Sequence, residues 1–321
     1  MTAADAMPAA DAMAAAYDVI VYGPLFCDLI FTGLDDLPAL GKEHFADDLT
    51  IAIGGSAIVA AGLHKLGARV GLIAELGSDP LSLVARHLLD ELGVDRTLIR
   101  EHTHPLPQVT VAMSFPHDRA FVTRFKRPDA PPDLAAILRD HPAKHLHVCS
   151  FLAVLETPDA ARIAHEAGMT ISMDPGWDDD ALHDPRLHAM IGELDIFLPS
   201  RSELCYIAGQ QDHNAAARRT LATMHNGLIV MKDGARGAEA FTPDSRDGQR
   251  VPAIAVTPVD TTGAGDAFDA GYLYAYVSGL PLDVCMQYGS ICGGLATTAP
   301  GGATASPSLA EVEKWLSKSR S

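Results

Sequence analysis

The stretch Asp260-Thr261-Thr262-Gly263-Ala264-Gly265-Asp266-Ala267-Phe268 is the most informative part of the chain. It follows a segment rich in Val, Thr and Pro and opens a predicted helix of small and aromatic residues. Gly263, Ala264 and Gly265 leave the backbone nearly bare at the start of that helix. The N–H groups there have no partner inside the helix and lie at the positive end of its dipole. The pattern therefore predicts a binding site for an anion.

An acidic residue follows directly on this predicted anion site. A carboxylate would repel a stored phosphate, but it suits phosphoryl transfer, because Asp266 can accept the proton of a hydroxyl that attacks phosphorus. The backbone N–H groups would then stabilise the charge that develops on the transferred group. From these residues alone a structural alternative stays open, because Asp is common in the first turn of helices.

The rest of the chain predicts an α/β architecture. Apolar runs at 18–22, 70–74, 145–149, 170–174, 195–199 and 227–232 have the length of buried strands. Helical patterns alternate with them and continue after them, at 56–67, 81–92, 158–167, 202–208, 267–278 and 284–297. Such alternation implies right-handed crossovers, and hence a three-layer, Rossmann-like αβα core around a mostly parallel sheet.

Two β-rich segments, about 33–53 and 106–126, do not fit this alternation. We expect them to pair into a small sheet at the carboxyl edge of the core, where it would act as a lid over a ligand. Phe115, Phe121 and Phe125 would either stack on that ligand or form the lid's own core. The Ala-rich residues 1–16 are expected to form a disordered tail, and 17–321 a single domain.

Composition narrows the function classes. The 321 residues are 48% hydrophobic, too many for a disordered chain, and carry a net charge of −17, which argues against a nucleic-acid partner. No apolar run reaches the ~18 residues of a membrane span. The five cysteines form no Cys-x-x-Cys pair, and the N-terminus lacks the basic region of a signal peptide. These features predict a cytoplasmic protein with reduced thiols.

The 260–268 stretch resembles the second signature of the PfkB family of carbohydrate kinases, which have the ribokinase-like fold. Other segments resemble motifs of that family in the expected order: the first strand and its sugar-binding Asp (23–28), the start of the lid (37–41), the first signature (54–67), Gly-x-Asp (77–79), the central Asp-Pro (174–175) and the nucleotide loop (232–237). No Gly-x-x-x-x-Gly-Lys loop occurs, which excludes a Walker-type kinase.

The resemblance implies roles for the matching positions. Asp266 is similar to the catalytic base, and Gly263, Ala264 and Gly265 are similar to the anion hole for the γ-phosphate of ATP. The remaining implied contacts are Asp28, Gly54, Gly55 and Ser56 for the substrate; Ser200, Lys232, Gly234, Gly237 and Thr262 for the nucleotide; Glu203 for Mg²⁺ through water; and Asp260 and Thr262 for a monovalent cation such as K⁺.

The chain departs from the family pattern at two places. An Asn that usually binds the substrate is absent, and Ile58 or Val59 stands in its place. The Asn-x-x-Glu motif begins with Ser200, although its Glu203 is present. Lys232 stands where Thr is frequent, and it would either contact phosphate or cap a strand.

The sequence thus predicts an ATP-dependent kinase that phosphorylates a hydroxyl of a small sugar. Two alternatives remain: a nucleoside kinase of the same fold, and a non-catalytic regulator that binds sugar or nucleotide. An apolar face on the lid would allow a homodimer through that sheet.

Overall fold

The computed structural model describes residues 16–115, 119–244 and 248–319. Residues 1–15 of the predicted tail and the predicted turn at 116–118 lie outside these ranges. The core is an eight-stranded sheet in the order β14-β13-β12-β11-β10-β9-β1-β4. Its strands are β1 (Tyr17–Tyr22), β4 (Val70–Ile73), β9 (Ala143–Cys149), β10 (Thr170–Asp174), β11 (Ile196–Phe197), β12 (Leu228–Lys232), β13 (Ala238–Phe241) and β14 (Gln249–Val251). The neighbouring strands β4, β1, β9, β10, β11 and β12 run parallel, and β13 and β14 add an antiparallel edge.

Helices cover both faces of this sheet, which confirms the predicted three-layer core. One face packs against α1 (Ser56–Leu66), α2 (Pro80–Glu91), α9 (Ala264–Val277), α10 (Leu282–Ala296) and α11 (Leu309–Ser319). The other packs against α3 (Leu134–Asp140), α4 (Phe151–Glu156), α5 (Ala160–Glu166), α6 (Pro185–Glu193), α7 (Arg201–Ala208) and α8 (His213–Leu221). No helix within the described ranges is both long and apolar enough to cross a membrane.

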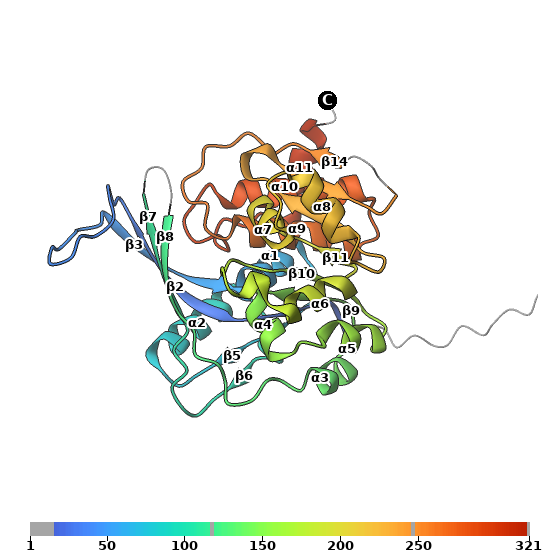
Figure 1. Ribbon diagram of the computed structural model, residues 1–321. Helices are drawn as coiled ribbons and strands as arrows, with labels where there is room; N and C mark the ends of the chain where they lie inside the picture. Colours follow the sequence, from blue (N-terminus) through green and yellow to red (C-terminus); the bar gives the residue numbers. More distant parts are fainter. Residues whose placement is uncertain (1–15, 116–118, 245–247, 320–321) are drawn as a thin grey trace, which may run out of the picture.

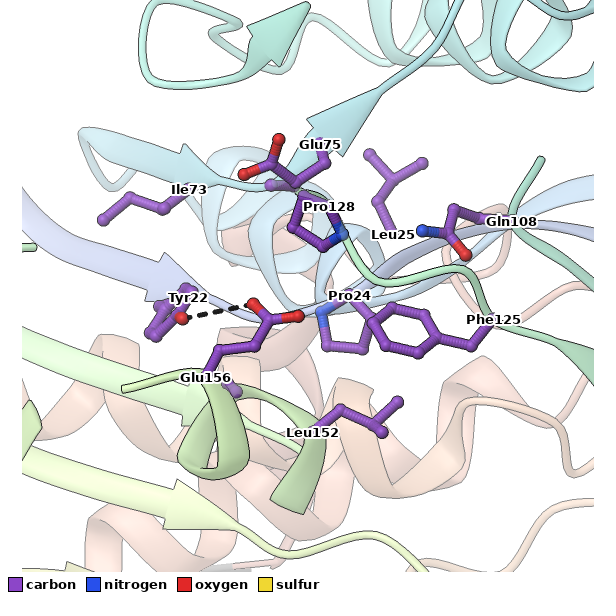
Figure 2. A pocket seen from close by; sticks show the side chains of 13 residues that line it. Tyr22, Pro24, Leu25, Ile73, Glu75, Gln108, Phe125, Pro128, Leu152 and Glu156 are labelled. Atoms are coloured by element: carbon purple, nitrogen blue, oxygen red, sulfur yellow. Dashed lines mark hydrogen bonds between the residues drawn. The ribbon is translucent and has the colours of Figure 1, made fainter. Parts of the chain in front are cut away.

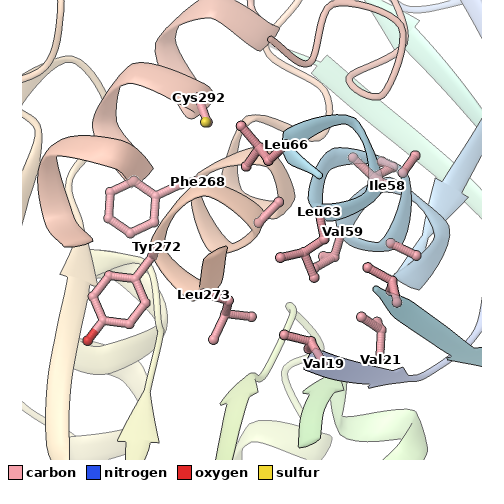
Figure 3. Close-up of a cluster of buried hydrophobic side chains, with 14 of the residues drawn as sticks. Val19, Val21, Ile58, Val59, Leu63, Leu66, Phe268, Tyr272, Leu273 and Cys292 are labelled. Atoms are coloured by element: carbon pink, nitrogen blue, oxygen red, sulfur yellow. The ribbon is translucent and has the colours of Figure 1, made fainter. Parts of the chain in front are cut away.

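Strand β1 shows why both faces must be covered. Its side chains alternate, so Val19 and Val21 enter the cluster with α1 and α9, while Ile20 and Tyr22 enter the opposite one. Figure 3 shows the first cluster, in which residues of α1 and α9 close over Val19 and Val21. This packing fixes the start of α9 above the carboxyl ends of the parallel strands.

A second, four-stranded sheet projects from one end of the core (Figure 1). We call it the small sheet; its strand order is β3 (Asp48–Gly55), β2 (Leu25–Thr32), β7 (Val109–Ser114) and β8 (Arg119–Arg124). Two short strands, β5 (Glu75–Leu76) and β6 (Arg100–Glu101), pair separately.

The small sheet is built from partly different strands than those predicted for the lid. Strands β7 and β8 fall inside the predicted 106–126 segment, but the 33–53 segment contributes only β3. Residues 33–47 contain no helix or strand. The remaining strand is β2, which follows β1 after only Gly23 and Pro24 and pairs with both β3 and β7. The prediction missed this strand because β2 lies so close to β1 in the sequence.

Candidate active site

The loop of residues 260–266, which we call the anion-hole loop, is held in place by its own carboxylate. Asp260 Oδ1 accepts hydrogen bonds from the backbone N–H of Thr262 at 2.9 Å and from its hydroxyl at 2.7 Å. Asp260 Oδ2 accepts one from the N–H of Gly301 at 3.1 Å. Both oxygens of this buried side chain are therefore used to shape the loop.

Gly263 makes the sharp turn into α9. Its φ of +71° lies in the left-handed region, and a Cβ there would lie 2.9 Å from Ile58 Cδ1 and 3.1 Å from Gly302 Cα. Helix α9 begins at Ala264, and its first intrahelical bond runs from Ala267 N–H to Gly263 C=O. The Ala264 N–H donates to the Thr261 carbonyl oxygen at 3.3 Å, and the N–H groups of Gly263 and Gly265 lie at the positive N-terminus of α9, where the anion hole is predicted.

Asp266 lies in the first turn of α9, beside these N–H groups. Burial, and then the nearby Asp174 carboxylate, raise the pKa of Asp266 to about 7, while Lys232 opposes the shift. A carboxyl with a pKa in the neutral range is well matched to taking a proton from a hydroxyl. The structure thus places this carboxyl beside the predicted anion hole.

Asp28 faces the same site from β2 of the small sheet. It is buried, and its Oδ1 has no hydrogen-bond partner among the described residues. Burial, and then the charges of Asp266 and Asp260, raise the pKa of Asp28 to about 7. Gly54 makes room for this carboxyl, because a Cβ at Gly54 would lie 2.2 Å from Asp28 Oδ1. An unpartnered buried acceptor of this kind suits a ligand hydroxyl.

Ser56 differs from its prediction as a substrate contact. Its side chain is fully buried, and its hydroxyl lies 3.0 Å from the carbonyl oxygens of both Gly23 and Pro24. Its backbone N–H also donates to Pro24. Gly55, with φ of +63°, completes this turn, since a Cβ there would lie 2.3 Å from the Pro24 oxygen. Ser56 therefore fastens the turn between β3 and α1 instead of facing a ligand.

Ser200 and Glu203 form a capping box at the start of α7. The Ser200 hydroxyl accepts from Glu203 N–H at 3.3 Å, and Glu203 Oε2 accepts from Ser200 N–H at 2.6 Å. Burial and then Asp174 raise the pKa of Glu203. Ser200 also bridges to Lys232, so the predicted nucleotide residues of β12 and α7 are neighbours.

Lys232 is held by carboxylates in this structure. Its Nζ lies 2.6 Å from Asp174 Oδ2 and 3.0 Å from Asp269 Oδ2. Beyond it the chain turns sharply through Gly234 and Gly237, whose φ values are +54° and +96°. The sequence predicted that Lys232 either contacts phosphate or caps a strand, and neither prediction included this ion-pair cluster.

Arg119 is a site residue that sequence reasoning missed. It begins β8 in the small sheet, and its Nη1 donates to the Thr262 hydroxyl at 3.3 Å. The register of the small sheet, which no local sequence pattern reports, brings Arg119 to the site. Asp28 lies opposite Thr110, and Thr110 lies opposite Thr123, which shares a face of β8 with Arg119. The small sheet therefore presents an acidic and a basic side chain toward the anion-hole loop.

A groove of about 610 Å³, also missed, runs along α10 beside residues 249–254. Its wall includes Gln287 and Ser290, whose side-chain oxygens are buried without a partner among the described residues. One turn further along α10, a Cβ on Gly293 would lie 2.9 Å from the Ala264 carbonyl oxygen. The groove thus lies next to the anion-hole loop.

A separate small cavity lies where the small sheet joins the core. Figure 2 shows Tyr22 and Glu156 at one side of it, joined by a hydrogen bond, with Phe125 and Gln108 at the other. Its volume of about 20 Å³ is enough for a water molecule and too small for a sugar.

Comparison with known proteins identifies the family of this chain. The pfkB family carbohydrate kinase model matches residues 18–309. A fructokinase of Klebsiella pneumoniae is 31% identical over 283 residues, which cover 82% of this chain and 91% of that protein.

Two solved structures show the same fold. A putative ribokinase II from E. coli in complex with ATP and Mg²⁺ superposes with a TM-score of 0.77 at 22% identity, covering 94% of this chain and 99% of that one. A nucleoside kinase of Methanocaldococcus jannaschii gives a TM-score of 0.77 at 21% identity, covering 95% and 99%. The chain belongs to the pfkB family of carbohydrate kinases, phosphotransferases that act on an alcohol group.

Proposed function

We propose that this kinase transfers the γ-phosphate of Mg·ATP to a hydroxyl of a sugar, with Asp266 as the general base. One observation carries the proposal. Asp28 on β2 of the small sheet and Asp266 in the first turn of α9 lie close enough to interact electrostatically, and both have a pKa near 7. Because Asp266 also adjoins the anion-hole loop, an acceptor hydroxyl held between the two carboxyls would face the transferred phosphate.

In the proposed step, the acceptor hydroxyl loses its proton to a carboxylate oxygen of Asp266 while its oxygen forms a bond to the γ-phosphorus. The bond between that phosphorus and the β–γ bridging oxygen breaks, and ADP leaves. The N–H groups of Gly263 and Gly265 would stabilise the charge on the transferred group, joined by that of Ala264 once it leaves the Thr261 carbonyl oxygen. Arg119 adds a positive charge from the small sheet.

The acceptor would be bound by Asp28, Gly54 and Gly55. A carboxylate can accept bonds from two hydroxyls, as a polyol requires. Ile58, which is buried against Gly263, supplies an apolar wall where the family usually has Asn. We therefore expect fewer hydrogen bonds to the sugar than in typical ribokinases.

The nucleotide base would lie in the groove along α10, with its phosphates running to the anion-hole loop. Ser200, Lys232, Gly234, Gly237 and Thr262 would contact the nucleotide. Gln287 and Ser290, whose oxygens lack partners among the described residues, suit the polar edge of a purine.

Magnesium would be held mainly by phosphate oxygens and water. Mg²⁺ usually keeps several of its waters when it binds, so few direct protein ligands are needed. Glu203 would bind one of those waters. Asp260 and Thr262 would adjoin a K⁺ site.

A nucleoside is the second candidate acceptor, and Phe121 favours it. This ring is 51% exposed and shares the face of the small sheet that carries Asp28. An exposed ring on that face could stack on a base, because aromatic rings favour offset stacking.

ADP formation from Mg·ATP across a panel of sugars, sugar phosphates and nucleosides, with and without K⁺, tests both candidates. We expect one class of acceptor to be turned over, and the Asp266→Asn variant to lose that activity. Activity confined to nucleosides would replace the sugar proposal. A variant that turned over normally would remove Asp266 as the base.

We also propose that two copies pair through the outer face of the small sheet. Register places eight apolar side chains on that face in two rows: Ile51, Leu29, Val111 and Val122; and Leu49, Phe31, Met113 and Ala120. Ile51 and Leu49 are each 45% exposed, and Val122 is 61% exposed. Apolar patches of this kind mark interaction sites.

Sedimentation of the purified protein tests the pairing. We expect a dimer that Val122→Glu converts to monomer, whereas Phe121→Glu, on the opposite face, leaves it intact. A wild-type monomer at micromolar concentration would contradict the proposal.

We propose a cytoplasmic location, because the cysteines are free thiols. All five cysteines are unpaired, and four of them are buried. Cell fractionation with a compartment marker would test it.

A further inference from the structure

A buried charged cluster lies directly beneath the anion-hole loop. Lys232 ends β12, Asp174 ends β10, and Asp269 belongs to α9, three residues after Asp266. The Lys232 ammonium contacts both carboxylates, at 2.6 Å and 3.0 Å. Asp269 is fully buried. The cluster therefore ties the first turns of α9 to the ends of two core strands.

Gly265 brings this cluster into contact with the anion hole. A Cβ on Gly265 would lie 3.6 Å from Lys232 Nζ and 3.9 Å from its Cε. Because Gly265 has no side chain, only bare backbone separates the ammonium from the place where the terminal phosphate is expected. Electrostatic effects over such a distance are strong where water is excluded.

The surrounding carboxylates keep Lys232 charged. Burial alone would lower the pKa of Lys232, but Asp174 and Asp269 raise it above its ordinary value. Lys232 in turn lowers the pKa of Asp174 below its ordinary value, against the effect of burial. The Lys232 ammonium is thus the charged group of this cluster that lies nearest Gly265 and the anion hole, and Asp174 and Asp269 both contact it.

We propose that Lys232 is a positioning residue for the terminal phosphate. Held by Asp174 and Asp269, its ammonium fixes the first turn of α9 and attracts the γ-phosphate into the anion hole. This inference rests on the proposed kinase function and adds a claim of its own: Lys232 makes the enzyme prefer ATP over ADP, because only ATP carries the phosphate that reaches this charge.

The test compares the dissociation constants of ATP and ADP, measured by calorimetry with Mg²⁺. Lys232→Met combined with Asp269→Asn replaces the ammonium and one of the two carboxyl groups that contact it by neutral side chains of similar size. We expect ATP binding to weaken by roughly 10- to 100-fold, as for loss of a charged hydrogen bond, with much less change for ADP. Asp269→Asn alone keeps the ammonium and should keep the preference for ATP.

Lys144→Met is the matched control. Lys144 also pairs with an aspartate, Asp18, at 2.9 Å, but it is 50% exposed and lies on β9. We expect both dissociation constants to stay at the wild-type values in this variant.

An unchanged ratio of ATP to ADP affinity in the folded double variant would overturn the inference and leave Lys232 a purely structural role. If the double variant does not fold, Lys232→Arg decides, since it keeps the charge and should keep the preference; its loss in a folded protein would overturn the inference. Failure of wild-type enzyme to phosphorylate any acceptor would contradict the proposed function but not the affinity ratio.

Discussion

The anion-hole loop and the small sheet meet at one site, but they are supported very differently. In the loop, both oxygens of Asp260 are hydrogen-bonded, and Gly263 packs against Ile58 and Gly302. The small sheet instead offers a carboxyl oxygen on Asp28 that no described residue contacts by a hydrogen bond, and an apolar outer face. The loop is preorganised before any ligand binds. The small sheet, in contrast, has a carboxyl oxygen and an apolar face that are available to bind a ligand or partner. We infer that the loop performs phosphoryl transfer and the sheet selects the acceptor.

Gly263→Ala should disrupt the anion-hole loop and give the largest effect among the glycine substitutions. The new Cβ would crowd Ile58 and demand a left-handed backbone, displacing donors of the anion hole. We expect turnover with every acceptor to fall about 100-fold or more, with a loss of about 1–2 kcal/mol in unfolding free energy. Steady-state assays and thermal melting would measure both.

Gly279→Ala is its control. Gly279 also has a positive φ, +74°, but a Cβ added there would meet no atom within 4 Å, because the residue lies just beyond the exposed end of α9. A similar loss of stability with normal turnover is expected. Equal turnover in the two variants would show that the loop geometry is not what matters.

Gly54→Ala should disrupt the part of the site that the small sheet provides. A Cβ there would collide with the Asp28 carboxyl and push it from its place. Because Asp28 is proposed to hold the acceptor, we expect the acceptor KM to rise about 10- to 100-fold, with the KM for ATP nearly unchanged. Parallel rises in both constants would argue that the two regions do not divide the work.

Arg119→Met tests the point where the two regions touch. The guanidinium donates to Thr262, so its loss should lower kcat/KM roughly tenfold. Arg124→Met is matched to it, because Arg124 lies five residues along β8 and hence on the opposite face. An equal loss of activity in both variants would show that the loss comes from the removed positive charge and not from the contact with Thr262.

The smallest expected effect is that of pH. Asp266 must be ionised to act as a base, and its pKa of about 7 means that protons compete for it below that value. We expect kcat/KM to rise about three- to tenfold between pH ~6.5 and ~7.5 and then level off. Because Asp28 titrates in the same range and interacts with Asp266, the apparent pKa belongs to the pair. A flat profile would contradict this electrostatic description.

Most of the core was predictable because its signals are local. Strands such as Thr170–Asp174 are short apolar runs, and α9 starts at a glycine-rich turn. The edge strands β13 and β14 were missed, since Ala238–Phe241 and Gln249–Val251 are short and have no strong alternation. The small sheet was predicted only in part, because its pairing joins β2 to β7, which lie far apart in the sequence.

The residues of the site were also predictable only where the sequence signal is local. Asp266 and the residues at 263–265 belong to one continuous motif, so their neighbourhood followed from the sequence. The contact between Arg119 and Thr262 joins positions that are 143 residues apart, and no local pattern reports it. Ser56 was assigned to substrate by its place in a motif, but the tight turn at Gly55 directs its hydroxyl to the backbone.

The most direct test of the division between loop and sheet is a kinetic comparison of Asp266→Asn with Asp28→Asn, two substitutions that each replace a carboxylate by an amide of the same shape. We expect Asp266→Asn to lower kcat by about 100- to 10,000-fold and to leave ATP affinity unchanged. Asp28→Asn should chiefly raise the acceptor KM, again without an effect on ATP. Normal turnover in the first variant, or loss of ATP binding in the second, would contradict this division.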